Sequence, residues 1–187
     1  GGSVFLFTGT WSASAGNELA FTIYGKETAN IGKSDNSIGN VTFTKNKSQR
    51  LISYPTASED ASIEINATTQ QNLAESFLIN KNFTIDLIRF RMLRTGSPGG
   101  QVYVEIYDDN GSGSPGAFRT SSLNRVNISS IGVSAQYVDF KFNDSALTAG
   151  NKYHAIIKVS AAYAYVAATN LLSVRSDNSS PLYLQGS

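Results

Sequence analysis

The stretch Val102-Tyr103-Val104-Glu105-Ile106 decides the fold class, because its apolar side chains recur at every second position. A period of two is typical of a β-strand with one face in the core and the other toward solvent. The same alternation recurs at residues 137–142 and 153–159, and clusters of Gly, Asn, Asp or Ser bound each segment. We therefore expect an all-β chain.

Weaker alternation predicts further strands, at residues 19–24, 40–44, 50–54, 61–65, 163–167 and 171–174. Between residues 83 and 92 the apolar positions change from odd to even after Leu87, which predicts a β-bulge or a strand that crosses between sheets. Residues 69–77 fit a helical turn or a strand equally well. About ten short strands without a long helix predict a jelly-roll-like antiparallel β-sandwich.

The length of 187 residues suits one substantial core and is short for two full domains. We expect an N-terminal strand arm at residues 1–11 and a single jelly-roll β-sandwich at residues 12–187. Within that body we expect a polar turn at residues 12–17 and a connector at residues 56–62. Two small sandwiches are the alternative.

The composition narrows the classes of function. The net charge is +1 and only 16% of residues are charged, so no basic surface for nucleic acid or an anionic membrane is expected. No apolar run approaches the about 18 residues of a membrane span. The absence of cysteine excludes thiol catalysis, zinc–thiolate sites and disulfide bonds.

A series of motifs between residues 73 and 175 follows an order known from other proteins. The series comprises Leu73-Ala74-Glu75-Ser76-Phe77, Ile88-Arg89-Phe90-Arg91, residues 99–111, Ser114-Pro115-Gly116, residues 138–142 and residues 147–153. This order resembles the jelly-roll modules of phage tail and virion proteins and of microbial surface-anchored proteins. The resemblance covers a little over half of the chain, and it implies a structural or glycan-binding module and not an enzyme.

The N-terminal arm contains Val4-Phe5-Leu6-Phe7, which carries large apolar groups on both faces. A strand of this kind has to be buried on both sides. It either forms the first strand of its own sheet or inserts into the open groove of a neighbouring subunit, where it pairs through its main chain. Val4, Phe5, Leu6 and Phe7 are therefore the candidate assembly residues.

Few residues are candidates for metal binding or catalysis. The run 108–113, Asp-Asp-Asn-Gly-Ser-Gly, alternates oxygen side chains before a glycine, as calcium loops do. Its twelfth position, which an EF-hand fills with a bidentate Glu, is Arg119, so a hairpin turn is the better interpretation. His154 is the only histidine, and we expect it to be partly exposed and to point away from the side of Tyr153. We expect no enzymatic activity, catalytic residue, metal or cofactor.

Aromatic residues could bind sugars, because flat rings cover the apolar face of a pyranose. The chain has nine Tyr, ten Phe and one Trp, and Tyr163, Tyr165 and Tyr183 are the candidates. The alternative is ordinary packing across strands.

Asn-x-Ser/Thr sequons exceed the chance expectation. Eight of the sixteen asparagines begin one, whereas a Ser and Thr content of roughly one fifth predicts roughly three. The candidate glycosylation sites are Asn40, Asn46, Asn66, Asn82, Asn110, Asn127, Asn143 and Asn178. Their use would make the protein a secreted glycoprotein, and the alternative is that a Ser-, Thr- and Asn-rich composition alone produces them.

These features together predict a non-enzymatic structural subunit of an extracellular assembly. The specific hypothesis is a glycosylated, pilus-like cell-surface filament, archaeal in character, in which copies of the chain are joined by strand donation. One alternative is a virion protein, such as a tail, capsid-decoration or receptor-binding domain on the virion surface. Another is a carbohydrate-binding module that takes surface glycans.

Overall fold

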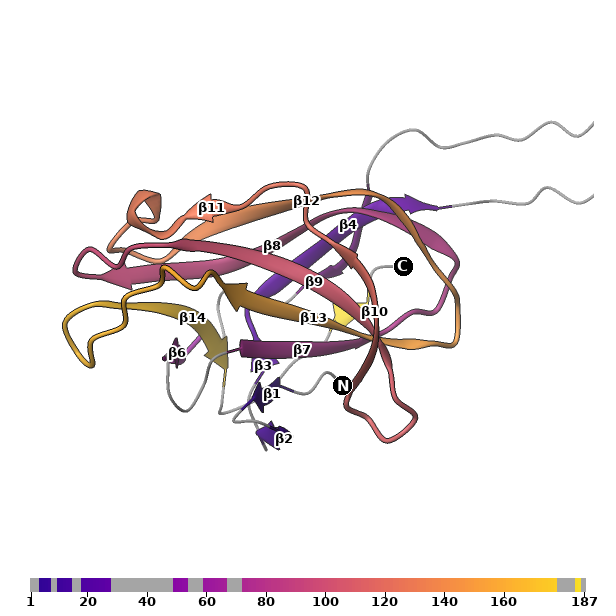
Figure 1. The fold of residues 1–187 in the computed structure, drawn as a ribbon. Helices are drawn as coiled ribbons and strands as arrows, with labels where there is room; N and C mark the ends of the chain where they lie inside the picture. The colour runs from indigo at the N-terminus through magenta and orange to yellow at the C-terminus, as the bar shows by residue number, and fades with distance from the viewer. Residues whose placement is uncertain are drawn as a thin grey trace, which may run out of the picture.

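The computed structural model describes residues 4–7, 10–14, 18–27, 49–53, 59–66, 72–177 and 184–185. Two antiparallel β-sheets pack face to face, with β7, β9 and β13 in one layer and β4, β8 and β12 in the other (Figure 1). This arrangement confirms the all-β sandwich. The described part contains no helix long and apolar enough to cross a membrane.

The first sheet has seven strands among the described residues and the order β10-β9-β13-β7-β1-β2, with β11 pairing on β9. Its strands are β1 (Val4–Phe7), β2 (Trp11–Ser14), β7 (Asn72–Leu78), β9 (Gln101–Asp109), β10 (Pro115–Ser121), β11 (Val126–Asn127) and β13 (Lys152–Val159). We call it sheet A. A short 3-10 helix, Ile128–Ser130, follows β11.

The second sheet, sheet B, has eight strands among the described residues and the order β15-β5-β4-β8-β14-β3, with β12 on β8 and β6 on β14. Its strands are β3 (Glu18–Leu19), β4 (Phe21–Glu27), β5 (Gln49–Ser53), β6 (Ala61–Ile65), β8 (Phe83–Thr95), β12 (Gln136–Leu147), β14 (Leu171–Asp177) and β15 (Leu184–Gln185). Strand β8 lies at its centre, because β12 pairs along one edge and β4 and β14 share the other.

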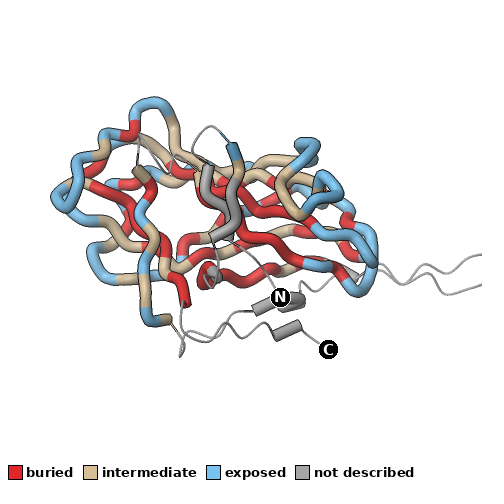
Figure 2. The backbone as a smooth tube through the Cα atoms, turned by 90° about the horizontal axis from the view of Figure 1, so that it is seen from below, coloured by how far each residue is buried: buried red, intermediate tan, exposed pale blue. Residues whose placement is uncertain are grey.

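One apolar core fills the space between the sheets, and Figure 2 shows long buried stretches of the backbone inside the molecule. Sheet A contributes Val104 and Ile157, among others, from β9 and β13. In sheet B, Phe90 stacks on Phe21 with ring centroids 5.8 Å apart and meets Phe140 edge-on at 6.4 Å. Burial of each such side chain in the shared core contributes about 1.5–3 kcal/mol, so the removal of these rings from water stabilises the packing of sheet B on sheet A.

The change of face predicted within β8 is confirmed. Ile85 is buried before the change and Ile88 after it, while residues 86 and 87 are both half-buried. Both neighbouring strands, β4 and β12, shift their register opposite residues 85–87. An extra residue in one strand of a pair re-aims the side chains that follow, which is why the inward positions change from odd to even.

Several predicted elements differ from the structure. Residues 163–167 form no strand, because Val166 and Asn170 instead close a turn with hydrogen bonds in both directions. The polar turn predicted at residues 12–17 is wrong for residues 12–14, which belong to β2 because they pair with β1 in register. Over Asn72–Leu78 the ambiguous segment is the strand β7, and residues 40–44 lie outside the described residues.

Candidate functional site

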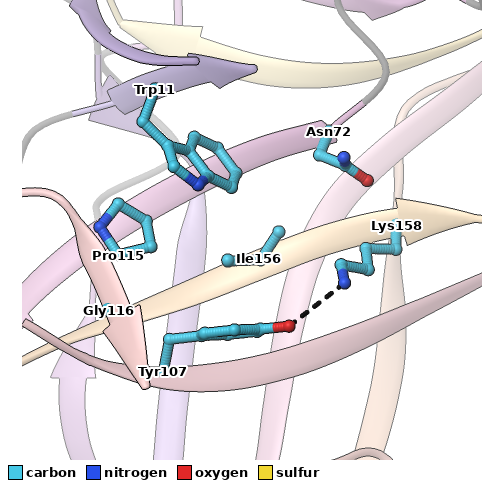
Figure 3. Close-up of a pocket in the computed structure, with 7 residues that line it drawn as sticks. All are labelled: Trp11, Asn72, Tyr107, Pro115, Gly116, Ile156 and Lys158. Atoms are coloured by element: carbon cyan, nitrogen blue, oxygen red, sulfur yellow. Dashed lines mark hydrogen bonds between the residues drawn. The ribbon is translucent and has the colours of Figure 1, made fainter. Parts of the chain in front are cut away.

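The outer face of sheet A carries a cavity of about 250 Å³, which we take as the candidate site. It is lined by Trp11 of β2, Asn72 of β7, Tyr107 of β9, Pro115 and Gly116 of β10, and Ile156 and Lys158 of β13 (Figure 3). These residues come from five strands that the sheet order brings together across about 150 positions of sequence. We call this space the outer cavity.

Strand alternation places apolar side chains on this face. On β13, Ile157 belongs to the core between the sheets, so Ile156 points to the opposite side. There Ile156 and Ala74 form a second, small apolar cluster, and Trp11 and Tyr107 pack against it. Ile156 is 1% exposed, so sheet A is buried on both faces at this point and the cluster forms the floor of the cavity.

Two of the lining side chains, Tyr107 and Lys158, form a hydrogen-bonded group of three with Glu105. Lys158 Nζ lies 2.6 Å from Glu105 Oε2 and donates to the Tyr107 hydroxyl at 3.2 Å. The Tyr107 hydroxyl donates to Glu105 Oε2 at 2.9 Å. Because the ammonium and the carboxylate are paired, this group of three offers hydrogen bonds with no net charge.

Two side chains of this group, Lys158 and Tyr107, have a raised pKa. Burial lowers the pKa of Lys158, but its hydrogen bonds to Glu105 and Tyr107 outweigh burial, and the net pKa is raised. For the Tyr107 phenol, burial has the opposite effect and raises the pKa. Lys158 is therefore an ammonium and Tyr107 a neutral donor at pH 7.

An exposed aromatic residue supports the ring of Tyr107 from the side of β10. Phe118 meets Tyr107 edge-on, with ring centroids 5.6 Å apart, and is 56% exposed. Edge-to-face pairs of this kind have a preferred geometry, so Phe118 restrains the orientation of the Tyr107 ring.

His154 lies on the same outer face, away from the core side chain of Tyr153, but it is fully buried and not partly exposed as the sequence predicts. The strand β13 is an inner strand between β7 and β9. His154 Nε2 lies 2.8 Å from Asp109 Oδ2. Burial lowers the pKa of His154, and the contact with Asp109 opposes this shift only in part.

The acidic run after β9 forms a hairpin turn. Asp109 Oδ1 accepts hydrogen bonds from the backbone N–H of Gly111 at 2.8 Å and of Gly113 at 3.2 Å. Asp108 pairs with Arg119, with 2.7 Å between Nη2 and Oδ1. Among the described residues no group of three or more His, Cys, Asp or Glu side chains could hold a metal ion.

Comparisons with protein-family models, with curated proteins and with solved structures found no match to this chain.

Two of the three tyrosines proposed for sugar stacking, Tyr163 and Tyr165, pack against the core in the part of the chain that the structure describes. Tyr163 is buried, its hydroxyl donates to the carbonyl of Ile65 at 2.6 Å and accepts from Leu172 N–H at 2.9 Å, and burial raises its pKa to about 12. Tyr165 packs partly buried against the core. Tyr183 lies outside the described residues. The prediction is wrong for Tyr163, whose hydroxyl joins β6 to β14.

Several sequon asparagines lie where a glycan has room. Asn82, Asn110, Asn127 and Asn143 are exposed, and Asn66 is half-buried at the end of β6. Asn82 uses its Oδ1 to accept from Ala149 N–H, which leaves the amide nitrogen on the other side of the group. Asn40, Asn46 and Asn178 lie outside the described residues. Glycosylation stays a prediction.

The N-terminal strand β1 pairs with β7 on one side and with β2 on the other. The register places Val4, Phe5, Leu6 and Phe7 opposite residues 72–75 of β7. Among the described strands, β7 is the partner through which the β1–β2 hairpin joins the rest of sheet A. We call residues 4–14 the N-terminal hairpin.

Sequence reasoning missed the residues of the outer cavity. Tyr107 and Lys158 each stand at the polar positions of an alternating strand, a pattern that is also typical of an ordinary solvated face. Trp11 is the only tryptophan, which is the one local feature that marks it. The pairing of β2 with β1, and of β1 with β7, brings it to the others, and alternation does not encode that order.

Proposed function

We propose that the chain is a non-catalytic structural subunit of an extracellular assembly, in which the N-terminal hairpin of one copy pairs with β7 of the next. The observation that carries the proposal is the pairing of β1 along β7, at the end of the sheet farthest from β10. A hairpin at this place can be exchanged between identical chains without changing a single hydrogen bond of the pairing.

The connection of the hairpin to the body favours exchange. Strand β2 ends at Ser14 in sheet A, and β3 begins at Glu18 in sheet B, so residues 15–17 join two different layers. A short hinge loop favours exchange of an element between subunits. Exchange then joins the copies head to tail. A head-to-tail contact whose rotation does not close into a ring propagates a filament.

The position of the sequons supports an extracellular setting. Exposed Asn82 lies between β7 and β8, and exposed Asn110 lies between β9 and β10, so both stand in turns. Glycans there would leave the edge of β7 free to pair. The proposed subunit is therefore a glycosylated surface filament, and analysis of natively purified peptides for glycan mass separates it from an unglycosylated virion protein.

A disulfide trap tests the exchange, because the chain has no cysteine of its own. Phe7 and Asn72 are register partners across β1 and β7, so Phe7→Cys combined with Asn72→Cys should form a cross-link wherever the hairpin docks. Exchange predicts a ladder of covalent oligomers from assembled material on a non-reducing gel. Negative-stain electron microscopy of the same material checks for polymers.

The matched control pair is Leu78→Cys with Lys152→Cys, which are exposed register partners within the body of sheet A. That pair should cross-link within one chain and run as a monomer. If the hairpin pair also yields only monomers from assembled material, or if the chain assembles into nothing, strand exchange is wrong.

A further inference from the structure

We infer that the outer cavity binds one uncharged pyranose sugar ring, held between Trp11 and Tyr107 with its hydroxyl groups toward Asn72 and Lys158. The inference rests on the shape, the ring content and the hydrogen-bonding groups of the cavity. It does not depend on exchange of the hairpin, because the cavity is complete whether Trp11 comes from the same chain or from the next.

The size of the cavity limits what it can take. Its volume is about 250 Å³. Sites for drug-sized ligands measure about 300–1,000 Å³, so this cavity suits a single ring and not a buried oligosaccharide. A longer glycan would project from it into solvent.

The aromatic side chains stand on opposite sides of the space. In Figure 3 the indole of Trp11 lies on one side and the ring of Tyr107 on the other, with Ile156 between them at the floor. Pyranose rings have apolar faces of C–H groups that pack on aromatic rings, and Trp and Tyr combine such a surface with a polar tip. Ile156 supplies an apolar floor that rests on Ala74, and apolar surface of this kind favours contact with the C–H face of a sugar over contact with water.

The polar side chains gather at one end. Figure 3 places Asn72 and Lys158 together on the side away from Pro115. The Asn72 amide offers both donors and an acceptor, and the Lys158 ammonium offers donors, which is the mixture that sugar hydroxyl groups require. Because Lys158 is paired with Glu105 at 2.6 Å, an acidic sugar would meet the Glu105 carboxylate as well as the ammonium. The charge balance therefore selects an uncharged sugar.

Two sources could supply the same sugar chemistry. One is a glycan of another surface, and the other is a glycan of the assembly itself. Gly116 lines the cavity, and a Cβ placed on it would lie 3.1 Å from Asn110 Cα, so the sequon at Asn110 begins at the rim. Unglycosylated protein is titrated first, so that sugar binding to the cavity is measured in the absence of the chain's own glycans.

The sole tryptophan makes the cavity directly observable. Because Trp11 is the only indole in the chain, its fluorescence reports on this site alone. Full-length unglycosylated protein is titrated with the methyl glycosides of glucose, galactose, mannose and N-acetylglucosamine, and with glucuronic acid, up to about 50 mM. We expect a saturable change in Trp11 emission with at least one neutral glycoside, with saturation-transfer NMR signals from its ring protons, and a weaker response to glucuronic acid.

Variants separate binding from folding. Asn72→Ala removes hydrogen bonds to the sugar and leaves the aromatic rings in place, so it should weaken binding by about tenfold or more. Tyr107→Leu should do the same by removing the stacking surface. The matched control is Tyr137→Leu, which removes a 43% exposed tyrosine from sheet B, outside the cavity, and should bind as the unchanged chain does.

Each outcome decides the inference. Binding of a neutral glycoside that Asn72→Ala weakens and Tyr137→Leu leaves alone supports it. No response to any neutral glycoside, equal binding by all variants, or preference for glucuronic acid overturns it. If binding is found, glycosylated protein with and without Asn110→Gln shows the source: occupancy by the chain's own glycan would block the titration only when Asn110 is present.

Discussion

At the scale of single residues, the Tyr163 hydroxyl gives the sharpest prediction. It is buried and joins the carbonyl of Ile65 to the N–H of Leu172, so Tyr163→Phe leaves two buried main-chain groups without this partner. We expect the free energy of unfolding to fall by about 1–3 kcal/mol in urea titrations. Tyr165→Phe is the control, because its hydroxyl lies 3.5 Å from Glu64 near solvent, and it should change stability by less than about 0.5 kcal/mol. Equal losses in both variants would contradict this role.

The buried His154 predicts a pH dependence of stability. Burial lowers its pKa in the folded chain below the ordinary 6.5, so the unfolded chain takes up a proton first as the pH falls. The free energy of unfolding should therefore decrease between about pH 7 and about pH 5, where carboxylates contribute little. Urea titrations at both pH values measure it, and His154→Gln, in a chain with no other histidine, should flatten the dependence. A chain that is more stable at about pH 5 would show the opposite shift.

Asp109 extends the same trend to more acidic solution. Burial raises the pKa of its carboxyl, but the hydrogen bonds from His154, Gly111 and Gly113 outweigh burial and lower it below 3.8. The stability that these bonds contribute is present above the ordinary pKa and is lost as the pH falls through the folded-state pKa. Both members of the pair thus favour neutral over acidic conditions.

At the scale of elements, the turn between β9 and β10 predicts independence from metal ions. Asp109 caps the turn and contacts His154, while Asp108 pairs with Arg119, so the carboxylates of the loop are engaged within the protein. Treatment with EDTA should change the melting temperature by less than about 1 °C. A large decrease that added calcium reverses would show that the loop binds an ion.

The elements also show what alternation can predict. The odd-to-even change within β8 was visible in the sequence because each inward position there is a large apolar residue, such as Ile85 or Ile88. The prediction of a strand at residues 163–167 is wrong for two reasons. Tyr163 fits the apolar alternation, but its hydroxyl donates a hydrogen bond to the carbonyl of Ile65, and Val166 closes a turn with Asn170. Alternation reports burial, and it does not distinguish a strand from a turn that packs on the core.

At the scale of the whole molecule, the sandwich followed from the sequence and the outer cavity did not. Period two identifies the core face of β9 and β13, but it cannot show that the other face is also covered. In the sequence, Ile156 is one of two adjacent apolar residues, and nothing marks the face it occupies. In the structure, the order β13-β7-β1-β2 brings Ala74 and Trp11 to it. That order is a long-range property, and no short motif encodes it.

The N-terminal hairpin provides the last prediction, because its docking can be rebuilt from two pieces. A chain without residues 1–14 lacks β1, the strand that pairs with one edge of β7. It keeps the core between the sheets, whose residues come from β4, β7, β8, β9, β12, β13 and β14, among others. If the hairpin is an exchangeable element, this chain should remain a folded monomer, and a synthetic peptide of residues 1–14 should bind it.

The truncated chain contains no tryptophan, so the emission of Trp11 in the peptide reports docking without background. Emission should shift to shorter wavelength as the indole packs against the cluster of Ala74 and Ile156. A peptide with Phe5→Asp is the control, since a charged group at a paired position should weaken docking. A truncated chain that aggregates would place the hairpin in its own sandwich. A truncated chain that still forms polymers would show that other surfaces join the copies. Docking of the peptide to a folded monomer would support exchange, because β7 of one copy would then accept a hairpin from another chain.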